Sequence, residues 1–381
     1  MAPPKPTVVD IHTHMYTPSY IKLLEARSAI PLVRQFTQAP EPRMVLLESE
    51  SRALADALRD PSSAAAKSVG RPLTLDYTSL QHKMSFMDAH GIDISVVSLA
   101  NPWLDFVAAD EAGQVAQDVN TEMADMCEQQ PGRLYFFGVL PLRATLETVT
   151  SSVQHLQRLQ RCRGVIMGTN GMGNGLDDKK LLPVFEALAA AQLTLFLHPH
   201  QGLPEALGGN SGGADYGHVL PLALGFPFET TVGVTRMYLS GVFDAVRNLR
   251  LILAHSGGTL PFLAGRIESC IQHDAELARA AKQGKERRSV WHVLREQIYL
   301  DAVVYSDVGV AAAIGASGAD RLMFGTDHPF FPPLAGIDMD GLWPSVSMNA
   351  TAVTKAVGEG TPDAKAIMGA NAIKILGLEQ K

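Results

Sequence analysis

The chain has 381 residues and a mass of 41.0 kDa, with 46% hydrophobic residues, 19% charged residues and a formal net charge of −7. This length fits one domain with a large core, and no apolar run approaches the roughly 20 residues that would span a membrane. The negative charge and the lack of any Lys/Arg run also disfavour nucleic acid as a partner.

Eight short apolar runs rich in β-branched residues alternate with helix-length segments, which is the pattern of repeated βα units. The expected strands are residues 8–11, 94–99, 134–139, 165–167, 193–197, 251–253, 298–301 and 322–324. Apolar residues at helical spacing predict helices within 76–90, 109–130, 144–160, 178–191 and 259–280. The sequence therefore predicts an α/β fold, a (β/α)8 TIM barrel that forms one domain over residues 1–381.

Two segments do not fit this repeat: residues 16–75 are rich in Pro, Ser and Ala, and residues 199–226 are rich in Gly and Pro. Both follow predicted strands, and segments after strands lie on the catalytic face of a barrel. We expect residues 16–75 to be an insertion or lid on that face, and residues 199–226 to be a second segment that covers the substrate.

The chain contains three cysteines, Cys127, Cys162 and Cys270, without the spacing of a disulfide framework or a thiolate zinc site. The N-terminal MAPPKPTVVDIHTH enters a strand-like run without the apolar region of a signal peptide. We therefore expect a cytoplasmic protein.

The first predicted strand ends in V-V-D-I-H-T-H, which places His12 and His14 on the same side of the strand. Two imidazoles in that arrangement can share one metal ion. Two exposed histidines could equally be solvated, so this spacing alone leaves the metal site undecided.

Three further strands end in ionisable residues, in L-F-L-H-P-H, I-L-A-H-S-G-G and M-F-G-T-D-H-P. These place His198, His255 and Asp327 at the barrel mouth that His12 and His14 occupy. Three imidazoles and one carboxylate suit zinc, with manganese or iron as alternatives, so His12, His14, His198 and Asp327 are the candidate ligands.

Three more histidines lie at the same mouth. His255 is the candidate acid/base or substrate-positioning group. The neighbouring His200 and His328 are alternatives for which strand alternation favours supporting or structural roles.

Together these motifs resemble the amidohydrolase superfamily, specifically its decarboxylase branch. Within that branch the chain is most similar to the fungal isoorotate decarboxylases, through runs such as A-H-S-G-G-T-L-P-F-L-A-G-R-I-E-S-C and R-L-M-F-G-T-D-H-P-F-F-P-P. The resemblance covers nearly the whole chain. It implies a nonoxidative carboxy-lyase that converts isoorotate (uracil-5-carboxylate) to uracil and CO2 in thymine salvage, without a redox cofactor.

The resemblance also implies roles for individual residues. The metal ligands would be His12, His14, His198 and Asp327, the active-site histidine would be His255, and Arg71, Asn101 and Phe330 would contact the substrate. Our own mechanistic hypothesis adds that Asp327 delivers a proton to C5. Arg266 would reach the site of a neighbouring subunit, which implies a homodimer or a larger homo-oligomer. Without the resemblance, Arg71 could be a solvated cation, Asn101 a turn residue before a proline, and Phe330 part of the core.

The end of the fourth predicted strand bears on the number of metal ions. Binuclear amidohydrolases bridge two metals with a modified lysine at this point, and R-G-V-I-M-G-T-N contains no lysine. We therefore expect one metal ion per chain, most simply zinc.

Three alternative functions remain open on the residues alone. The enzyme could decarboxylate a hydroxybenzoate such as γ-resorcylate or 2,3-dihydroxybenzoate. It could be a metal-dependent amidohydrolase or lactonase, because the same ligands can activate water. A metal-binding scaffold without activity is the third alternative.

Overall fold

Parallel strands in chain order form the centre of the molecule. The computed structural model describes residues 6–46, 50–200, 202, 219–281, 287–334 and 342–379. Within these ranges, one parallel sheet has eight strands, each paired with the next. They are β1 (Val9–His14), β5 (Ile94–Ser98), β6 (Leu134–Val139), β7 (Cys162–Gly168), β8 (Thr194–His198), β9 (Leu251–Leu253), β10 (Ile298–Asp301) and β11 (Leu322–Met323). The expected strands and the expected (β/α)8 barrel are confirmed.

The barrel closes between the first and last strands, although β11 has only two residues. Ile11 N donates to Phe324 O over 3.1 Å, and Asp327 N donates to His12 O over 2.7 Å. An isolated parallel bridge joins Thr13 to His328. The seam is therefore held by a few single contacts rather than by a long ladder.

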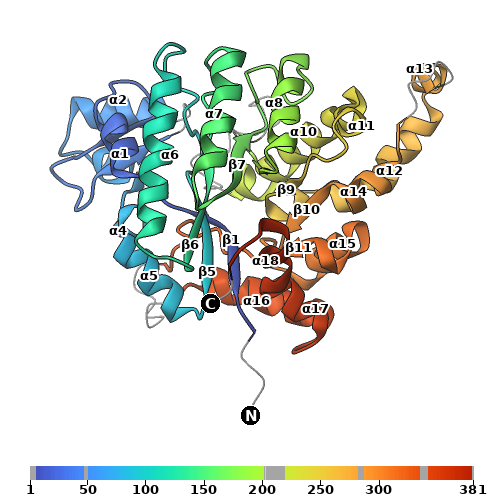
Figure 1. Cartoon of the computed structure of the whole chain (residues 1–381). Helices are drawn as coiled ribbons and strands as arrows, with labels where there is room; N and C mark the ends of the chain where they lie inside the picture. The colour runs from blue at the N-terminus through green and yellow to red at the C-terminus, as the bar shows by residue number, and fades with distance from the viewer. Residues whose placement is uncertain are drawn as a thin grey trace.

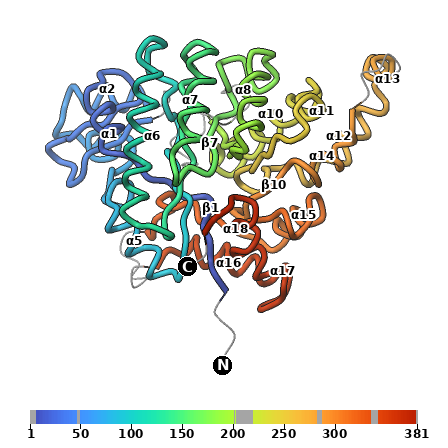
Figure 2. The backbone as a smooth tube through the Cα atoms, viewed as in Figure 1, coloured from blue at the N-terminus to red at the C-terminus, as the bar shows by residue number. Residues whose placement is uncertain are grey.

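Helices surround the strands, as Figure 1 shows. The larger ones after the insertion are α5 (Leu80–Ala89), α6 (Ala112–Glu128), α7 (Leu146–Arg158), α8 (Leu182–Ala190), α10 (Phe226–Ser240), α12 (Leu260–His273), α14 (Val290–Glu296), α15 (Asp307–Ser317) and α16 (Pro344–Val357). Shorter pieces are α4 (Leu75–Thr78), η2 (Lys179–Leu181), η4 (Leu220–Gly225), α11 (Val242–Ala245), η5 (His255–Gly257), α13 (Ala275–Ala280), η7 (Ala319–Arg321), α17 (Pro362–Lys365), η8 (Ala366–Ala370) and α18 (Asn371–Leu376). Near the end of the chain, α18 packs beside β1 (Figure 2).

Two predicted helices are divided by side-chain caps. The helix expected over 259–280 breaks at Asp274, whose carboxylate accepts from the backbone N–H groups of Glu276 and Leu277 and starts α13. The helix expected over 76–90 breaks at Ser79, whose hydroxyl accepts from His82 N and starts α5. In both places a short polar side chain satisfies the free N–H groups of a new helix start.

The insertion 16–75 has secondary structure of its own. It contains α1 (Pro18–Glu25), β2 (Leu32–Arg34), β3 (Arg43–Val45), α2 (Ser51–Arg59), α3 (Ala64–Ser68) and β4 (Arg71–Pro72). The three strands form a small sheet in the order β2-β3-β4. Leu32, Phe36, Val45, Leu54 and Val69 belong to a separate apolar cluster there. Of the second expected covering segment, 199–226, residues 201 and 203–218 lie outside the described residues.

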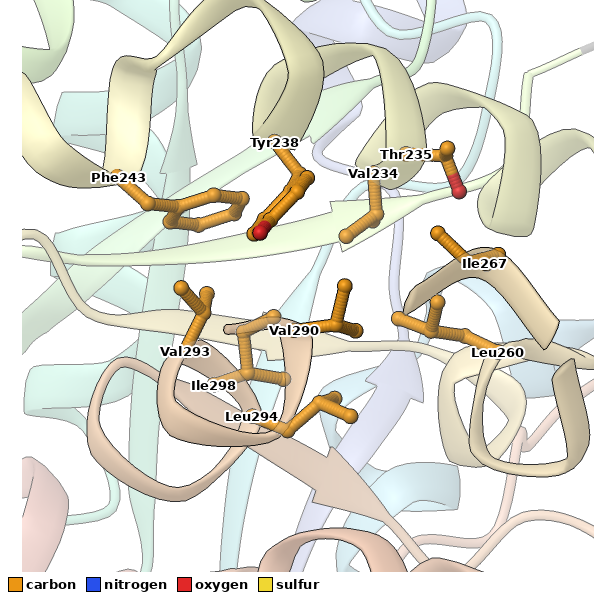
Figure 3. Close-up of a pocket in the computed structure, with 10 residues that line it drawn as sticks. All are labelled: Val234, Thr235, Tyr238, Phe243, Leu260, Ile267, Val290, Val293, Leu294 and Ile298. Carbon is orange, nitrogen blue, oxygen red and sulfur yellow. The ribbon is translucent and has the colours of Figure 1, made fainter. Parts of the chain in front are cut away.

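A projecting arm is the other departure from a plain barrel. In Figure 1, α12 runs outward from the barrel and carries α13 at its far end. At the root of α12, a small cavity is lined mainly by hydrocarbon, including Val234, Leu260, Ile267 and Val290 (Figure 3). This cavity is a packing gap where the arm meets α10 and α14. Among the described helices, none is both long and apolar enough to cross a bilayer.

Candidate active site

The C-terminal end of β1 carries two fully buried imidazoles, His12 and His14. His12 Nδ1 lies 2.6 Å from Asp301 Oδ2, and His14 Nδ1 lies 3.1 Å from Ser98 Oγ. The Nε2 atoms of both rings are buried without a hydrogen-bond partner. Because Asp301 and Ser98 contact the Nδ1 atoms, both rings are held in an orientation that leaves Nε2 free to bind a metal ion.

His198 and Asp327 complete a quartet around the same point. His198, the last residue of β8, donates from Nδ1 to Pro199 O over 2.8 Å, which leaves its Nε2 unprotonated. Asp327 Oδ1 lies 3.4 Å from His12 Nε2 and 3.5 Å from His14 Nε2. One ligand atom from each of the four residues lies within 4.8 Å of the other three. We name these four residues the metal quartet.

The electrostatics of the metal quartet fit a cation. Burial alone would raise the pKa of Asp327, but the charge of His12 and the nearby rings of His14 and His255 hold that pKa well below its usual range. Burial lowers the pKa of His14 to about 4 and that of His198 well below its usual value. Burial opposes a charge on His12, but the carboxylate of Asp327 outweighs it and raises the pKa of His12 to about 10, so this ring would release its proton when a metal binds. A buried carboxylate beside the Nε2 atoms of His12 and His14, which have no hydrogen-bond partner, is the donor set that a divalent metal requires.

His255 lies on the more open side of the metal quartet. Its Nε2 is 3.8 Å from Asp327 Oδ2, and its side chain is 16% exposed whereas that of His12 is fully buried. His255 and Ser256 take left-handed backbone angles, with φ of 53° and 52°. Asp301 holds this strained turn, because its carboxylate accepts from His255 N over 3.0 Å and from Ser256 N over 2.8 Å.

Asp301 is a site residue that the sequence reasoning missed. One carboxylate holds both the His12 ring and the turn that carries His255. It is the last residue of β10, as His198 is of β8. The rule that found the other strand-end residues could therefore have found Asp301 as well.

The insertion reaches the site through Arg71. Its guanidinium carbon lies 4.8 Å from the centre of the Phe330 ring, and that ring lies 5.4 Å from the His14 ring in an edge-on arrangement. Arg71 and Phe330 are thus brought next to the metal quartet.

Asn101 follows β5 and lies beside His200. Its Nδ2 donates to His200 O over 2.7 Å, and His200 Nδ1 lies 3.2 Å from Asp105 Oδ2. Glu229 on α10 accepts from the backbone N–H of His200 over 2.8 Å. His200 therefore lies outside the metal quartet, within the network that supports Asn101.

Arg266 and His328 also lie outside the metal quartet. Arg266 is exposed on α12, and no hydrogen bond or ion pair within the described ranges links it to the site. His328 is fully buried and its Nδ1 lies 2.7 Å from Lys83 Nζ.

Comparison with known proteins identifies the family. The family model described as amidohydrolase matches residues 9–378. The chain belongs to the amidohydrolase family.

Individual relatives resemble this amidohydrolase along most of its length. The crystal structure of IDCase (isoorotate decarboxylase) from Metarhizium anisopliae is 65% identical, covers 99% of this chain and 98% of that chain, and superposes with a TM-score of 0.94. A 2-amino-3-carboxymuconate-6-semialdehyde decarboxylase of Dictyostelium discoideum is 28% identical over 76% of this chain and 74% of its own. A dihydroxybenzoic acid decarboxylase of Polaromonas, solved with manganese and 2-nitroresorcinol, shares the fold at 21% identity and a TM-score of 0.67, covering 99% of this chain and 98% of that chain.

The end of β7 in this amidohydrolase carries Gly168, with no lysine in the strand. A Cβ atom at Gly168 would lie 2.4 Å from both His200 Nδ1 and a ring atom of Trp103. Any larger side chain is therefore excluded while these two rings stay in place. Trp103, whose ring centre is 6.0 Å from that of His198, is a second neighbour of the site that sequence reasoning did not single out.

Proposed function

We propose that this amidohydrolase converts isoorotate to uracil and CO2, with no redox cofactor, as a step of pyrimidine salvage. The observation that carries this proposal is the 65% identity to IDCase over 99% of the chain. We also propose a cytoplasmic location. The three cysteines are free thiols, which is typical of proteins in a reducing compartment.

The proposed cofactor is one divalent metal ion, zinc in the first place, held by the metal quartet. Three imidazoles and one carboxylate are typical zinc ligands, and the manganese of the Polaromonas enzyme makes manganese the alternative. When bound, the metal would supply a Lewis acid that orients the substrate carboxylate and offsets its charge.

The difficulty of the reaction is that CO2 must leave a vinylic carbon, whose bonding electrons then have no stabilised place. Protonation of C5 before the bond breaks removes this difficulty. We assign proton delivery to Asp327, which must first accept the proton because its carboxylate rests in the ionised form. The C5–carboxylate bond then breaks, CO2 leaves, and the electron pair restores the ring double bond.

His255 is the group we assign to supply that proton. Its Nε2 lies 3.8 Å from Asp327 Oδ2, and its partial exposure gives it contact with the mouth of the barrel. The other imidazoles near Asp327 belong to the metal quartet and would have their Nε2 atoms occupied. His255 can therefore exchange protons with solvent while the quartet is filled.

The rim residues would hold the pyrimidine. Phe330 presents a ring beside His14, so it can pack against a face of the substrate. Arg71, stacked on Phe330, and Asn101 would bind the polar edge of the pyrimidine. Because Arg71 belongs to the insertion, we propose that residues 16–75 act as a lid on a single barrel domain rather than as a second domain.

We propose that the enzyme is at least a homodimer, assembled through α12. Phe262 is 84% exposed and lies one helical turn before the exposed Arg266 on the same projecting helix. An exposed aromatic next to an exposed arginine is typical of contact surfaces between proteins. In this arrangement Arg266 would complete the site of the partner subunit.

Incubation of metal-analysed protein with isoorotate tests the proposal. We expect uracil and CO2 in equal amounts, about one metal per chain, and loss of turnover on chelation that zinc or manganese restores. Parallel incubations with 2,6- and 2,3-dihydroxybenzoate separate the substrates: a phenol product without uracil would identify a hydroxybenzoate decarboxylase. Hydrolysis of a lactone or cyclic amide without CO2 would identify a hydrolase, and a metal-replete protein inert toward all of them would indicate a scaffold.

A further inference from the structure

A buried ammonium group lies behind the metal quartet. Lys83 on α5 is fully buried, and its Nζ donates to Thr13 Oγ1 over 2.6 Å and to His328 Nδ1 over 2.7 Å. Thr13 lies between His12 and His14 in the chain, and His328 follows Asp327. One side chain thus bridges the neighbours of three of the four ligands.

This bridge lies at the seam between the first and last strands, where β11 has only two residues. An isolated pairing of Thr13 with His328 extends the seam beyond the end of β11. His328 O accepts from Thr13 Oγ1 over 3.1 Å and from His14 N over 2.7 Å, so His328 is bonded to β1 by both backbone and side chain. Because His328 directly follows Asp327 in the chain, the position of His328 constrains the backbone of Asp327. It therefore also constrains the distance from the Asp327 carboxylate to the imidazoles of His12 and His14.

The surroundings of His328 leave it little freedom to move independently of Lys83. Its ring stacks on Phe86 with centroids 3.6 Å apart and meets Trp343 edge-on at 4.5 Å. Its Nδ1 must be the acceptor, because an ammonium group can only donate. Loss of Lys83 would leave this nitrogen buried without its partner, and the ring would have to change its tautomer or its position.

Stability alone is a poor reason to bury an ammonium group. Desolvation of a charge is costly, and a well-packed apolar side chain in its place is often as stable or more stable. In some proteins a buried polar or charged group instead fixes one register among several. At this seam, the register decides whether ligands from the first and last strands meet.

We propose that Lys83 is a positioning residue that sets the spacing of Asp327 relative to His12 and His14 by fastening Thr13 to His328. It touches neither the metal nor the substrate. The inference rests on the metal site of the proposed function and not on the identity of the substrate.

Cobalt binding tests this role without any substrate. Apo-protein is titrated with Co2+ in competition with a chromogenic chelator, and the visible absorption of the Co2+ form reports ligand geometry. We expect Lys83→Met to raise the Kd by about tenfold to a hundredfold and to alter the spectrum, as loss of a group that orients ligands does. Thr13→Val, which removes only the hydroxyl, should change both in the same direction by a smaller factor.

Met87→Ala is the matched control. Met87 is fully buried one turn further along α5 and belongs to the main apolar core. This variant should unfold at a lower temperature and keep the wild-type Kd and spectrum. Kd and spectrum unchanged in folded Lys83→Met, or equally changed in Met87→Ala, would overturn the inference.

Two further outcomes are also decisive. If Lys83→Met does not fold, Thr13→Val decides alone: a wild-type Kd and spectrum in that variant would overturn the proposal. If the wild-type protein bound no Co2+, zinc or manganese, the metal site of the proposed function would fail instead.

Discussion

The metal quartet and the rim of the site are built in different ways. His12, His14 and His198 lie at or near the ends of strands that pair with neighbours on the sheet, and their rings are oriented by buried partners. Arg71 and Asn101 come from an insertion and a loop, and each is placed by a cation–π contact or by one hydrogen bond. The comparison indicates that the residues on barrel strands determine the type of reaction, whereas changes in the rim residues can alter the substrate specificity.

The largest effect should come from the metal quartet. Asp327→Asn removes the proposed proton donor while it keeps the size of the side chain, so kcat should fall by at least about a hundredfold. Turnover of isoorotate is measured together with metal content, with the exposed Asp307→Asn as control. Near-wild-type kcat in a metal-loaded Asp327→Asn protein would rule out the proposed proton route.

The rim should respond differently. Arg71→Met should lower kcat/KM by about tenfold to a hundredfold, mainly through KM, because a charged contact to the substrate is lost. Metal content should stay at the wild-type level. Arg59→Met is the matched control, since Arg59 lies in the same insertion with a side chain that is 76% exposed. Loss of metal in Arg71→Met would mean that the rim and the metal quartet are not independent.

Mixing two variants that we expect to be inactive tests whether Arg266 contributes to the site of a second subunit. Arg266→Ala and Asp327→Asn are combined in equal amounts, and exchange is verified by pull-down of differently tagged chains. Half of the randomly formed dimers are mixed and each has one complete site, so up to about a quarter of wild-type activity should return. Full activity of Arg266→Ala alone, or no recovery despite exchange, would refute a role in the partner's site.

The smallest effect concerns the network beneath the rim. Burial raises the pKa of Asp105 to about 7. The folded-state pKa of Asp105 therefore exceeds the unfolded value of 3.8. The contribution of protonated Asp105 to the stability of the fold is full below about pH 4 and is lost as the pH rises to about 7.

Asp105→Asn should abolish this pH dependence of the stability. Relative to the wild type, the variant should gain on the order of 1–2 kcal/mol between pH 5 and pH 8, less than the full shift implies because Asp105 is 21% exposed. Urea unfolding at the two pH values measures this gain. Asp110→Asn at an exposed position is the control, and a gain independent of pH would contradict the assignment.

Sequence alone predicted the barrel because each parallel strand is buried on both faces and reads as an apolar run. Its boundaries were less accurate. The predicted strand 8–11 extends to His14, because the polar ligands that end β1 belong to the strand and break the apolar pattern. The small sheet of the insertion was not predicted, since β2, β3 and β4 have only two or three residues each and no alternating pattern.

The ligands were predictable because they obey two local rules, period-two spacing and position at a strand end. Lys83 obeys neither rule, since it lies on a helix and its partner Thr13 is 70 positions away in sequence. Only the folded chain brings such a pair together. The roles proposed for Arg71, Asn101, Phe330 and Arg266 remain predictions until the variants are measured.

The metal quartet draws on both ends of the chain. Beside it, the hydrogen bond from Thr13 to His328 joins positions 315 residues apart. A ribosome releases His12 and His14 long before Asp327 exists, so a cation cannot find its complete set of ligands during the early steps of folding. It can only fasten a barrel whose strands are already assembled. A cell short of metal would therefore still build this enzyme, and the shortage would show as easier opening of the seam in the finished molecule.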